Sequence, residues 1–208
     1  MNRTTLFNNW AIFYDKSIGK NPIGYPFEGY YTVLKSINDK IEINKTTKIL
    51  DIGVGTGLLT TQLYKRGGKI YGIDFSEKMI IEAQKKMPKA VFYCSNFEND
   101  LPDKLNDIKF DYIVSSYAFH HLSDNKKLSF IKSLLLKLTK SGKIYIGDVS
   151  FKSKEDMKQN KLKFIDDWDH TEIYFIADQF LEMLHKNNIK ANHSQISFCA
   201  GVFELIKT

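Results

Sequence analysis

The feature that most constrains this chain is a short apolar run that breaks into alternating glycines, ILDIGVGTG at residues 49–57. Such a run is typical of a buried strand that turns directly into a helix, and in an open parallel sheet this turn lies at the carboxyl edge, where ligands bind. Glycine there permits positive φ angles and lets a ligand approach the backbone. A dinucleotide fingerprint would need a third glycine where Leu58 or Thr60 stands, and no Walker Gly-Lys-Ser/Thr follows. Nicotinamide, flavin and Walker-type phosphate sites are therefore disfavoured.

A carboxylate follows at the tip of the next expected strand. Asp74 stands about 20 residues beyond Gly53, the interval at which a neighbouring carboxylate can accept both hydroxyls of a ribose bound over the glycine turn. The alternative is that Asp74 only caps a helix that begins near Glu77. Together with the glycine turn, the spacing predicts a ribose-bearing ligand that is bound without a pyrophosphate cradle.

From residue 47 onward, strand-type runs alternate with helical ones, which indicates stacked βαβ units and a mostly parallel sheet in an α/β fold. The expected strands are 48–52, 69–73, 90–93, 110–115, 143–149, 191–198 and 199–206. The expected helices are 6–18, 27–41, 58–65, 77–87, 125–138, 161–168 and 173–187. We expect residues 151–159 to be a charged connection and the last two strands to form an antiparallel edge hairpin.

Four motifs in order resemble those of class I S-adenosylmethionine-dependent methyltransferases. They are DIGVGTG at 51–57, the acidic strand tip at Asp74, SNF at 95–97 and FDYIVS at 110–115. Residues 10–15 and 118–122 further resemble small bacterial stand-alone members that are described only as uncharacterised methyltransferases. The resemblance implies a Rossmann-like, doubly wound, mostly parallel seven-stranded sheet in a single domain of residues 1–208. It divides that domain into an N-terminal helical cap or lid, 1–44, and a cofactor-binding core, 45–208.

The resemblance implies S-adenosyl-L-methionine as the cofactor and assigns residues to its methionine and ribose ends. Gly53, Gly55 and Gly57 would line the methionine portion. Asp51 would reach the methionine ammonium group through a water molecule, and Asp74 would hold the ribose diol.

The resemblance places a second set of residues around the adenine. Phe75 and Met79 would lie against its two faces through stacking and sulfur contacts, and Phe97 would flank it. Asn96 stands where the family commonly has an aspartate, and its amide keeps a hydrogen-bond acceptor for the adenine amino group. Ser115, in the fourth motif, is also expected beside the cofactor.

Candidate catalytic residues follow the fourth expected strand and precede the first. Methyl transfer depends mainly on alignment of the acceptor, but an acceptor that arrives protonated would benefit from a base of near-neutral pKa, so His120 and His121 are candidates. The alternative is that one of them packs against or caps the helix near Ser123. Tyr14 is the candidate for ligand contact from an aromatic lid that also contains Trp10, although most aromatic stripes are core.

The acceptor is constrained mainly by what the sequence lacks. Thirty Lys and Arg against 24 Asp and Glu give a charge of +6, which permits an anionic partner, but only Arg3 and Arg66 are arginines and the lysines are scattered. Residues 115–118 hold neither the Asn/Asp-Pro-Pro-aromatic run of enzymes that methylate base amines nor a Pro-Cys nucleophile. We therefore expect a small-molecule methyl acceptor and disfavour nucleic acid. The alternatives are an RNA or protein methyltransferase, a non-catalytic S-adenosylmethionine-binding protein and, more remotely, an oxidoreductase.

Other classes of site and location are also disfavoured by the sequence. Cys94 and Cys199 have no metal-ligand or redox spacing, which fits a reducing, cytoplasmic setting. No apolar run approaches the ~18 residues of a membrane span, so no membrane partner is expected. The five histidines lack His-x-His or His-x-x-x-His spacing, so no metal site is expected. The oligomeric state and the methylated atom stay open.

Overall fold

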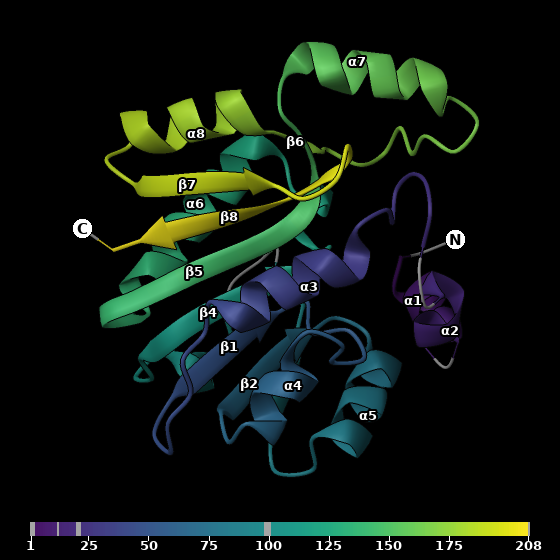
Figure 1. The fold of residues 1–208 in the computed structure, drawn as a ribbon. Coiled ribbons are helices and arrows are strands. Elements are labelled where there is room, and N and C mark those ends of the chain that lie inside the picture. Colours follow the sequence, from purple (N-terminus) through teal and green to yellow (C-terminus); the bar gives the residue numbers. More distant parts are fainter. Residues whose placement is uncertain (1–2, 12, 20–21, 98–100, 208) are drawn as a thin grey trace.

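The structure is a computed structural model that describes residues 3–11, 13–19, 22–97 and 101–207 (Figure 1). Its strands are β1 (Lys48–Ile52), β2 (Lys69–Asp74), β3 (Val91–Cys94), β4 (Phe110–Ser116), β5 (Leu138–Phe151), β6 (Phe175–Ile176), β7 (Lys190–Gln195) and β8 (Ala200–Ile206). Its α-helices are α1 (Arg3–Trp10), α2 (Tyr14–Ile18), α3 (Tyr30–Asp39), α4 (Thr60–Lys65), α5 (Glu77–Lys86), α6 (Asp124–Leu136), α7 (Lys154–Lys163) and α8 (Ala177–Lys186). Two 3₁₀ turns, η1 (Asp103–Leu105) and η2 (Phe119–His121), complete the list. Among these helices, none is both long and apolar enough to span a membrane.

The strand order is β3-β2-β1-β4-β5-β8-β7, and the short β6 pairs only with β5. Every pair from β3 to β5 is parallel, whereas β8 runs antiparallel to both β5 and β7. The expected Rossmann-like sheet with an antiparallel edge hairpin is thus confirmed. Because β1 is hydrogen-bonded to β2 on one side and to β4 on the other, the chain order reverses there, and the carboxyl ends of these strands enclose a crevice.

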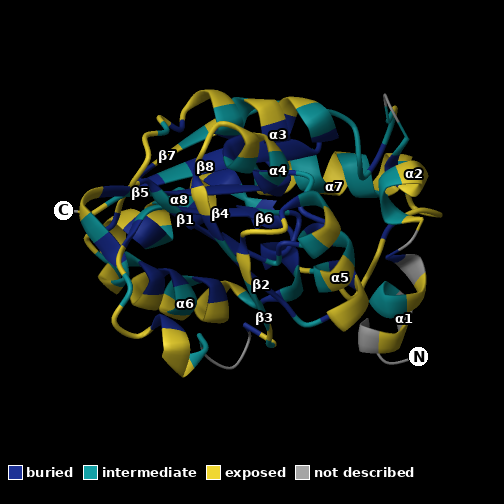
Figure 2. Cartoon of the chain, turned by 90° about the horizontal axis from the view of Figure 1, so that it is seen from below, coloured by how far each residue is buried: buried dark blue, intermediate teal, exposed yellow. Residues whose placement is uncertain are grey.

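The central strands of the sheet are buried on both faces, as a parallel sheet covered by crossover helices requires (Figure 2). Neighbouring residues of β1 point to opposite sides: Ile49 packs with the cluster that includes α3, α4 and α5, and Leu50 packs with the cluster that includes α6 and α8. Both side chains are fully buried. Apolar residues at positions 49, 50 and 52 follow from this two-sided burial.

Two short helices at the N-terminus lie at one side of the sheet, with α1 against α5 (Figure 1). Asn8 Oδ1 accepts a hydrogen bond from Ser76 Oγ at 2.7 Å. Asp15 accepts from Thr56 Oγ1 and from Lys86 Nζ, both at 2.5 Å. These contacts fasten the N-terminal segment to the glycine turn and to α5.

The expectation of one continuous helix over residues 6–18 is wrong, because α1 ends at Trp10 and α2 begins at Tyr14. Tyr14 of α2 nevertheless lines one pocket together with Phe7 of α1, whereas Phe13, between the two helices, is 59% exposed. The turn between the helices brings Asp15 to the glycine loop. The side chain of Trp10, also expected in the lid, lies outside the described parts.

Further corrections concern residues 138–176. β5 begins at Leu138, five residues before the expected start of the strand at residue 143. Gly142 allows the close approach of β4, since a Cβ there would lie 2.9 Å from the Phe110 carbonyl oxygen. The expected charged connection is instead the helix α7, whose Ser153 cap accepts from the Asp156 amide. None of the side chains of α7 is buried, so apolar periodicity could not indicate it. The expected helix 161–168 contains only the end of α7, and β6 replaces the first turn of the expected helix 173–187.

Candidate active site

The glycine turn is tied to the tip of β2. The backbone amides of Gly53 and Val54 both donate to the Ile73 carbonyl at 2.9 Å. Gly53, Gly55 and Gly57 have φ angles of +70°, +53° and +81°, which lie in the left-handed region that favours glycine. The backbone conformation therefore accounts for glycine at all three positions.

The surroundings of the three glycines differ. A Cβ on Gly53 would lie 2.5 Å from the Cβ of Ala118, and a Cβ on Gly57 would lie 2.6 Å from Met87 Cε. A Cβ on Gly55 would meet no described atom within 4 Å. Gly53 and Gly57 thus permit close packing within the protein, whereas Gly55 faces open space at the carboxyl edge of the sheet.

Asp74 lies at the tip of β2, as expected, and is only 5% exposed. Its Oδ2 accepts from the Gly55 amide and its Oδ1 from the Ser76 amide, both at 2.8 Å. Burial raises the pKa of Asp74 to about 6, although these hydrogen bonds act in the opposite direction. The cap of α5 is Ser76, whose Oγ accepts from the Met79 amide at 3.2 Å. The alternative reading of Asp74 as the cap is therefore not the arrangement found.

A pocket at this edge gathers residues from the glycine turn, β2, α5, β4 and the N-terminal segment. Its lining consists of Phe7, Tyr14, Gly53, Gly55, Asp74, Phe75, Met79, Phe97, Ser116, Tyr117, Ala118 and His121. Phe7 covers it from α1, with its ring centroid 5.2 Å from that of Phe75 and 6.1 Å from that of His121. The pocket joins most of the residues that the sequence predicted for adenine and ribose binding.

Several predicted residues lie outside the lining. Asp51 is buried beneath the turn, where its Oδ2 accepts from Thr60 Oγ1 at 2.9 Å and its Oδ1 has no partner among the described residues. Burial raises the pKa of Asp51 to about 8. Ser115 Oγ donates to the Ile52 carbonyl at 2.7 Å, so this hydroxyl links β4 to β1. Asn96 is exposed, and Gly57 packs against α5.

His120 is held between two carboxylates that the sequence did not associate with it. Its Nδ1 lies 2.6 Å from Asp148 Oδ1, and its Nε2 lies 3.3 Å from Glu172 Oε1. Burial alone would lower the pKa of His120, but the two carboxylates outweigh burial and raise that pKa to about 10. His120 is therefore cationic at neutral pH and unsuited to act as a base.

His121 takes a different direction from its neighbour and lines the pocket. Its Nδ1 lies 3.9 Å from Glu172 Oε1, and its ring centroid is 4.1 Å from that of His120. Burial would raise the pKa of Glu172, but its contacts with His120 and Tyr174 lower the pKa, so this carboxylate stays ionised. Glu172 thus presents a negative charge to the side of His121 that carries Nδ1.

Ligand atoms of His120, His121 and Glu172 lie within 4.8 Å of one another, a grouping that sequence spacing could not reveal. Glu172 comes from a loop 51 residues beyond His121. In the described contacts, His120 already pairs with Glu172 and with Asp148. An ion-pair cluster accounts for the grouping, and the expectation that no metal is bound stays a prediction.

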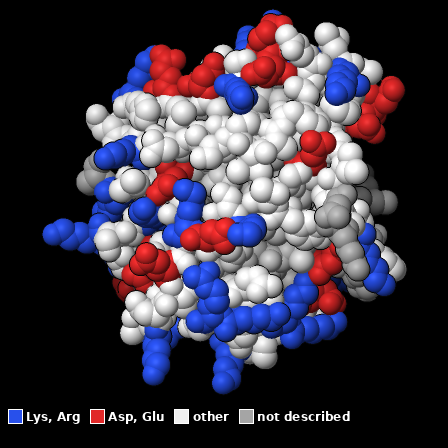
Figure 3. All heavy atoms as spheres, in the orientation of Figure 1, with Lys and Arg blue, Asp and Glu red and all other residues white. Residues whose placement is uncertain are grey.

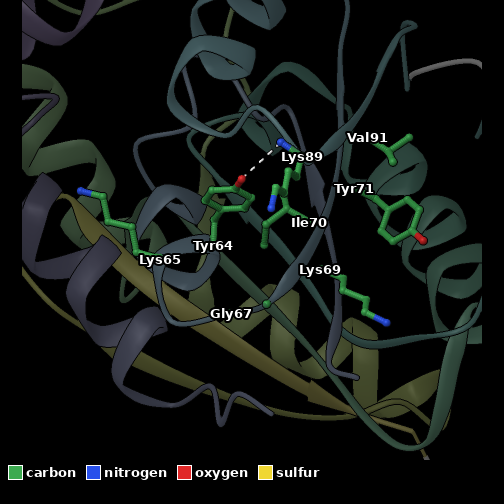
Figure 4. A pocket seen from close by; sticks show the side chains of 9 residues that line it. Tyr64, Lys65, Gly67, Lys69, Ile70, Tyr71, Lys89 and Val91 are labelled. Carbon is green, nitrogen blue, oxygen red and sulfur yellow. Dashed lines mark hydrogen bonds between the residues drawn. The ribbon is translucent and has the colours of Figure 1, made fainter. Parts of the chain in front are cut away.

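A larger hollow lies elsewhere, at the amino ends of β2 and β3 (Figure 4). Lys69 and Val91, which begin these strands, line it, and Tyr64 Oη accepts from the Lys89 amide at 3.2 Å. β2 ends at Asp74, so the hollow lies at the opposite edge of the sheet from the glycine turn. Ligands of open α/β sheets bind at carboxyl ends, which makes the smaller pocket the candidate active site.

Comparisons with known proteins agree with this geometry. A family model described as "Methyltransferase domain" matches residues 49–142. An uncharacterised methyltransferase of Alkaliphilus oremlandii is 40% identical over 152 residues, which cover 72% of this chain and 68% of the relative. An uncharacterised methyltransferase of Geobacillus kaustophilus is 32% identical over 213 residues, which cover 97% of this chain and 95% of the relative. The chain belongs to the class I S-adenosylmethionine-dependent methyltransferases.

Solved structures share the fold of this methyltransferase. One is described as "DhpI-SAM-HEP complex", with a TM-score of 0.75, 15% identity and coverage of 98% of this chain and 95% of that chain. Another is magnesium protoporphyrin IX methyltransferase from Synechocystis PCC 6803 with bound S-adenosylhomocysteine, with a TM-score of 0.71, 17% identity and coverage of 99% and 98%. Because the chain belongs to the family identified above, its cofactor is S-adenosyl-L-methionine.

The residues present fit that cofactor. Gly55 has open space where a side chain would intrude, and Asp74 offers carboxylate oxygens at the pocket wall. The buried Asp51 Oδ1, which lacks a described partner, is an acceptor suited to an ammonium group. Phe75, Met79 and Phe97 supply apolar surface for a purine.

Proposed function

We propose that this methyltransferase acts on a small molecule whose accepting atom carries a proton, and that His121 removes the proton during transfer. The observation that carries the proposal is the place of His121, which lines the same pocket as Gly55 and Asp74. When bound, S-adenosylmethionine supplies a methyl group on a sulfonium. The residues around it then need to align the acceptor and keep water out.

The surroundings of His121 support its role as the base. Glu172 lies on the Nδ1 side of the ring, which favours the tautomer with a proton on Nδ1 and a lone pair on Nε2. A positioned histidine of this kind contributes about 10²–10⁴ to the rate of a reaction that needs proton removal. His120 carries its own proton between Asp148 and Glu172 and serves to hold η2 in place.

Tyr14, the other predicted catalytic residue, is better suited to contact than to proton removal. Burial raises the pKa of Tyr14 to about 12, although a hydrogen bond with Tyr30 acts against that rise. The hydroxyl therefore keeps its proton at neutral pH. Asp15, the next residue, fastens α2 to Thr56 of the glycine turn, which keeps Tyr14 at the pocket wall.

The charges around the pocket support a small acceptor. None of the described lining residues is Lys or Arg, and Asp74 is the one carboxylate among them. On the face in Figure 3, lysines are interspersed with acidic residues and are most frequent toward the lower end, where Figure 1 has α4 and α5. A polyanion such as RNA would be expected to need cationic side chains at the pocket itself. The net charge of +6 still makes RNA the second candidate.

The proposal is tested with methyl-tritiated S-adenosylmethionine and three fractions of one cell extract: filtered small molecules, RNA and protein. We expect label in the small-molecule fraction. His121→Asn should lower that transfer about 100-fold or more, because the general base is lost. The affinity of the His121→Asn variant for S-adenosylmethionine, measured by calorimetry, should change little.

The exposed His170 provides the matched control, since His170→Asn makes the same change at a position outside the pocket lining. Its transfer rate should match that of the unsubstituted protein. Label in RNA or protein alone would replace the small-molecule proposal with the alternative class. Failure to form S-adenosylhomocysteine with any fraction would favour a non-catalytic binding protein.

A further inference from the structure

Tyr117, the residue after β4, has a buried hydroxyl without a described hydrogen-bond partner. The whole residue is only 9% exposed. Its φ of 52° lies in the left-handed region, which is rare for a bulky residue and is found where the surroundings fix the backbone, often at ligand sites. A buried polar group without a partner is unfavourable, so this position calls for an explanation.

Packing fixes the direction of the Tyr117 ring. It stacks on Tyr30, with centroids 4.6 Å apart and an interplanar angle of 23°, and lies 6.4 Å from the tilted ring of Phe27. Its backbone amide donates to the Gly147 carbonyl at 2.9 Å. Burial raises the pKa of Tyr117 well above 10, so the hydroxyl is a committed hydrogen-bond donor at neutral pH. Tyr117 also lines the pocket.

The strand order shows which part of the cofactor comes near this hydroxyl. With the ribose at Asp74 and the adenine against Phe75, the nucleoside lies over β2, and the methionine portion must extend across β1 toward β4. The glycine turn and the segment after β4 lie close together, because a Cβ on Gly53 would strike Ala118, the residue after Tyr117. Tyr117 therefore lies at the methionine end of the pocket.

Two buried atoms without a described partner, one beneath the glycine turn and one in the pocket lining, suit the two charged groups of an amino acid. Asp51 Oδ1 is a buried acceptor suited to the ammonium group, and the Tyr117 hydroxyl is a buried donor suited to the carboxylate. No described lining residue is Lys or Arg, so the carboxylate has no such cation to pair with in the lining. Hydrogen bonds from neutral donors to a carboxylate are short and strong in a buried site.

We propose that the Tyr117 hydroxyl donates a hydrogen bond to the methionine carboxylate of bound S-adenosylmethionine. This inference rests on the cofactor and is independent of the acceptor and of the role of His121. It makes Tyr117 a cofactor-binding residue that distinguishes S-adenosylmethionine from a nucleoside lacking the carboxylate. A contact between Tyr117 and the methyl acceptor is the competing assignment.

The test uses two ligands that differ only in the carboxylate, S-adenosylmethionine and decarboxylated S-adenosylmethionine, titrated by calorimetry into Tyr117→Phe. Loss of one hydrogen bond to a charged group should weaken S-adenosylmethionine about tenfold or more. Binding of the decarboxylated ligand should change less than about twofold, because Phe keeps the ring and its stacking. Tyr112→Phe is the matched control, since it removes a hydroxyl from the far end of β4, where it accepts from the Glu42 amide at 3.4 Å.

Thermal melting keeps the test independent of activity. The melting temperature of ligand-free Tyr117→Phe should equal or exceed that of the unsubstituted protein, because the change removes an unpartnered buried hydroxyl. The additional stabilisation by S-adenosylmethionine should be smaller in the variant. Equal weakening of both ligands, or unchanged S-adenosylmethionine binding with a raised KM for the acceptor, would overturn the inference. Absence of S-adenosylmethionine binding to the unsubstituted chain would overturn the inference about Tyr117 together with the assignment of the cofactor.

Discussion

Replacement of Asp148 by asparagine should destabilise the fold by removing one partner of a buried ion pair. Asp148 is fully buried in β5. Its Oδ2 accepts from the amides of Phe119 and His120 at 2.9 and 3.2 Å, and its Oδ1 accepts from the Val149 amide at 2.7 Å and contacts His120 Nδ1 at 2.6 Å. Asparagine keeps the size of the side chain but loses the charge. The His120 imidazolium would then lose its pairing with Asp148 and keep its pairing with Glu172.

Two arguments give the expected loss in the free energy of unfolding. Removing one member of a buried, hydrogen-bonded ion pair costs about 3–5 kcal/mol. The pKa of His120 rises from 6.5 to about 10 in the fold, a rise that corresponds to roughly 5 kcal/mol. We therefore expect Asp148→Asn to lower the free energy of unfolding by about 3–5 kcal/mol, or the melting temperature by about 6–20 °C for a chain of this size.

The pH dependence has a definite sign. The raised pKa of His120 gives stability that is fully present below pH 6.5 and lost as the pH rises through about 10. The pKa of Asp148 is lowered by His120 against the effect of burial, so its contribution is lost in acid. Between pH 8 and pH 10, the unsubstituted protein should therefore lose stability more steeply than Asp148→Asn.

Urea denaturation at pH 7.5, followed by tryptophan fluorescence, measures the free energy of unfolding. The exposed Asp166 gives the matched control, and Asp166→Asn should stay within about 0.5 kcal/mol of the unsubstituted protein. A loss below 1 kcal/mol for Asp148→Asn, or parallel pH profiles from 8 to 10, would show that the pair with His120 is not the source of this stability.

Asp74→Ala should weaken S-adenosylmethionine binding at least tenfold by calorimetry, and unchanged binding would remove the ribose role. In the unsubstituted protein, the same affinity should fall as the pH drops through about 6, where the Asp74 carboxylate takes up a proton; a flat profile from pH 8 to 5 would contradict this. Gly55→Ala should weaken cofactor binding, because its Cβ would enter the open space at the pocket. A positive φ strains alanine at both positions, but Gly53→Ala should lower the melting temperature further than Gly55→Ala, because its Cβ would also strike Ala118. Equal melting temperatures of the two variants would contradict this difference. Asp15→Ala removes the hydrogen bond to Thr56, so limited proteolysis should cut the N-terminal segment faster than in the unsubstituted protein.

The centre of the sheet could be predicted from sequence because its strands β1 and β4 are largely buried on both faces and stand out as mainly apolar runs. Residues 48–52 and 110–115 fall on β1 and β4. The helix α7 was missed because it buries none of its side chains, although Ser153 followed by acidic residues is a recognisable helix start. The break between α1 and α2 was missed because aromatic residues keep a helical spacing across it, and Phe7 and Tyr14 line one pocket although they lie on different helices.

The site could be predicted where its residues follow strand ends, and not where they meet through tertiary packing. Asp74 lies at the pocket as the spacing indicated. Glu172 joins His120 and His121 from a distant loop, and no periodic pattern connects them. Asp148 did leave a signal, a charged residue inside the apolar run of the fifth strand, which is tolerated only when it is paired.

The close approach of Gly53 and Ala118 links the position of the glycine turn to that of η2. Any side chain at position 53 would push on Ala118, and the next residues along the chain carry the two histidines of η2. A larger residue at position 53 of the glycine turn would therefore displace η2, which carries the proposed base His121. Across relatives, these two positions should covary in size, and engineering of acceptor preference would have to treat them as one unit.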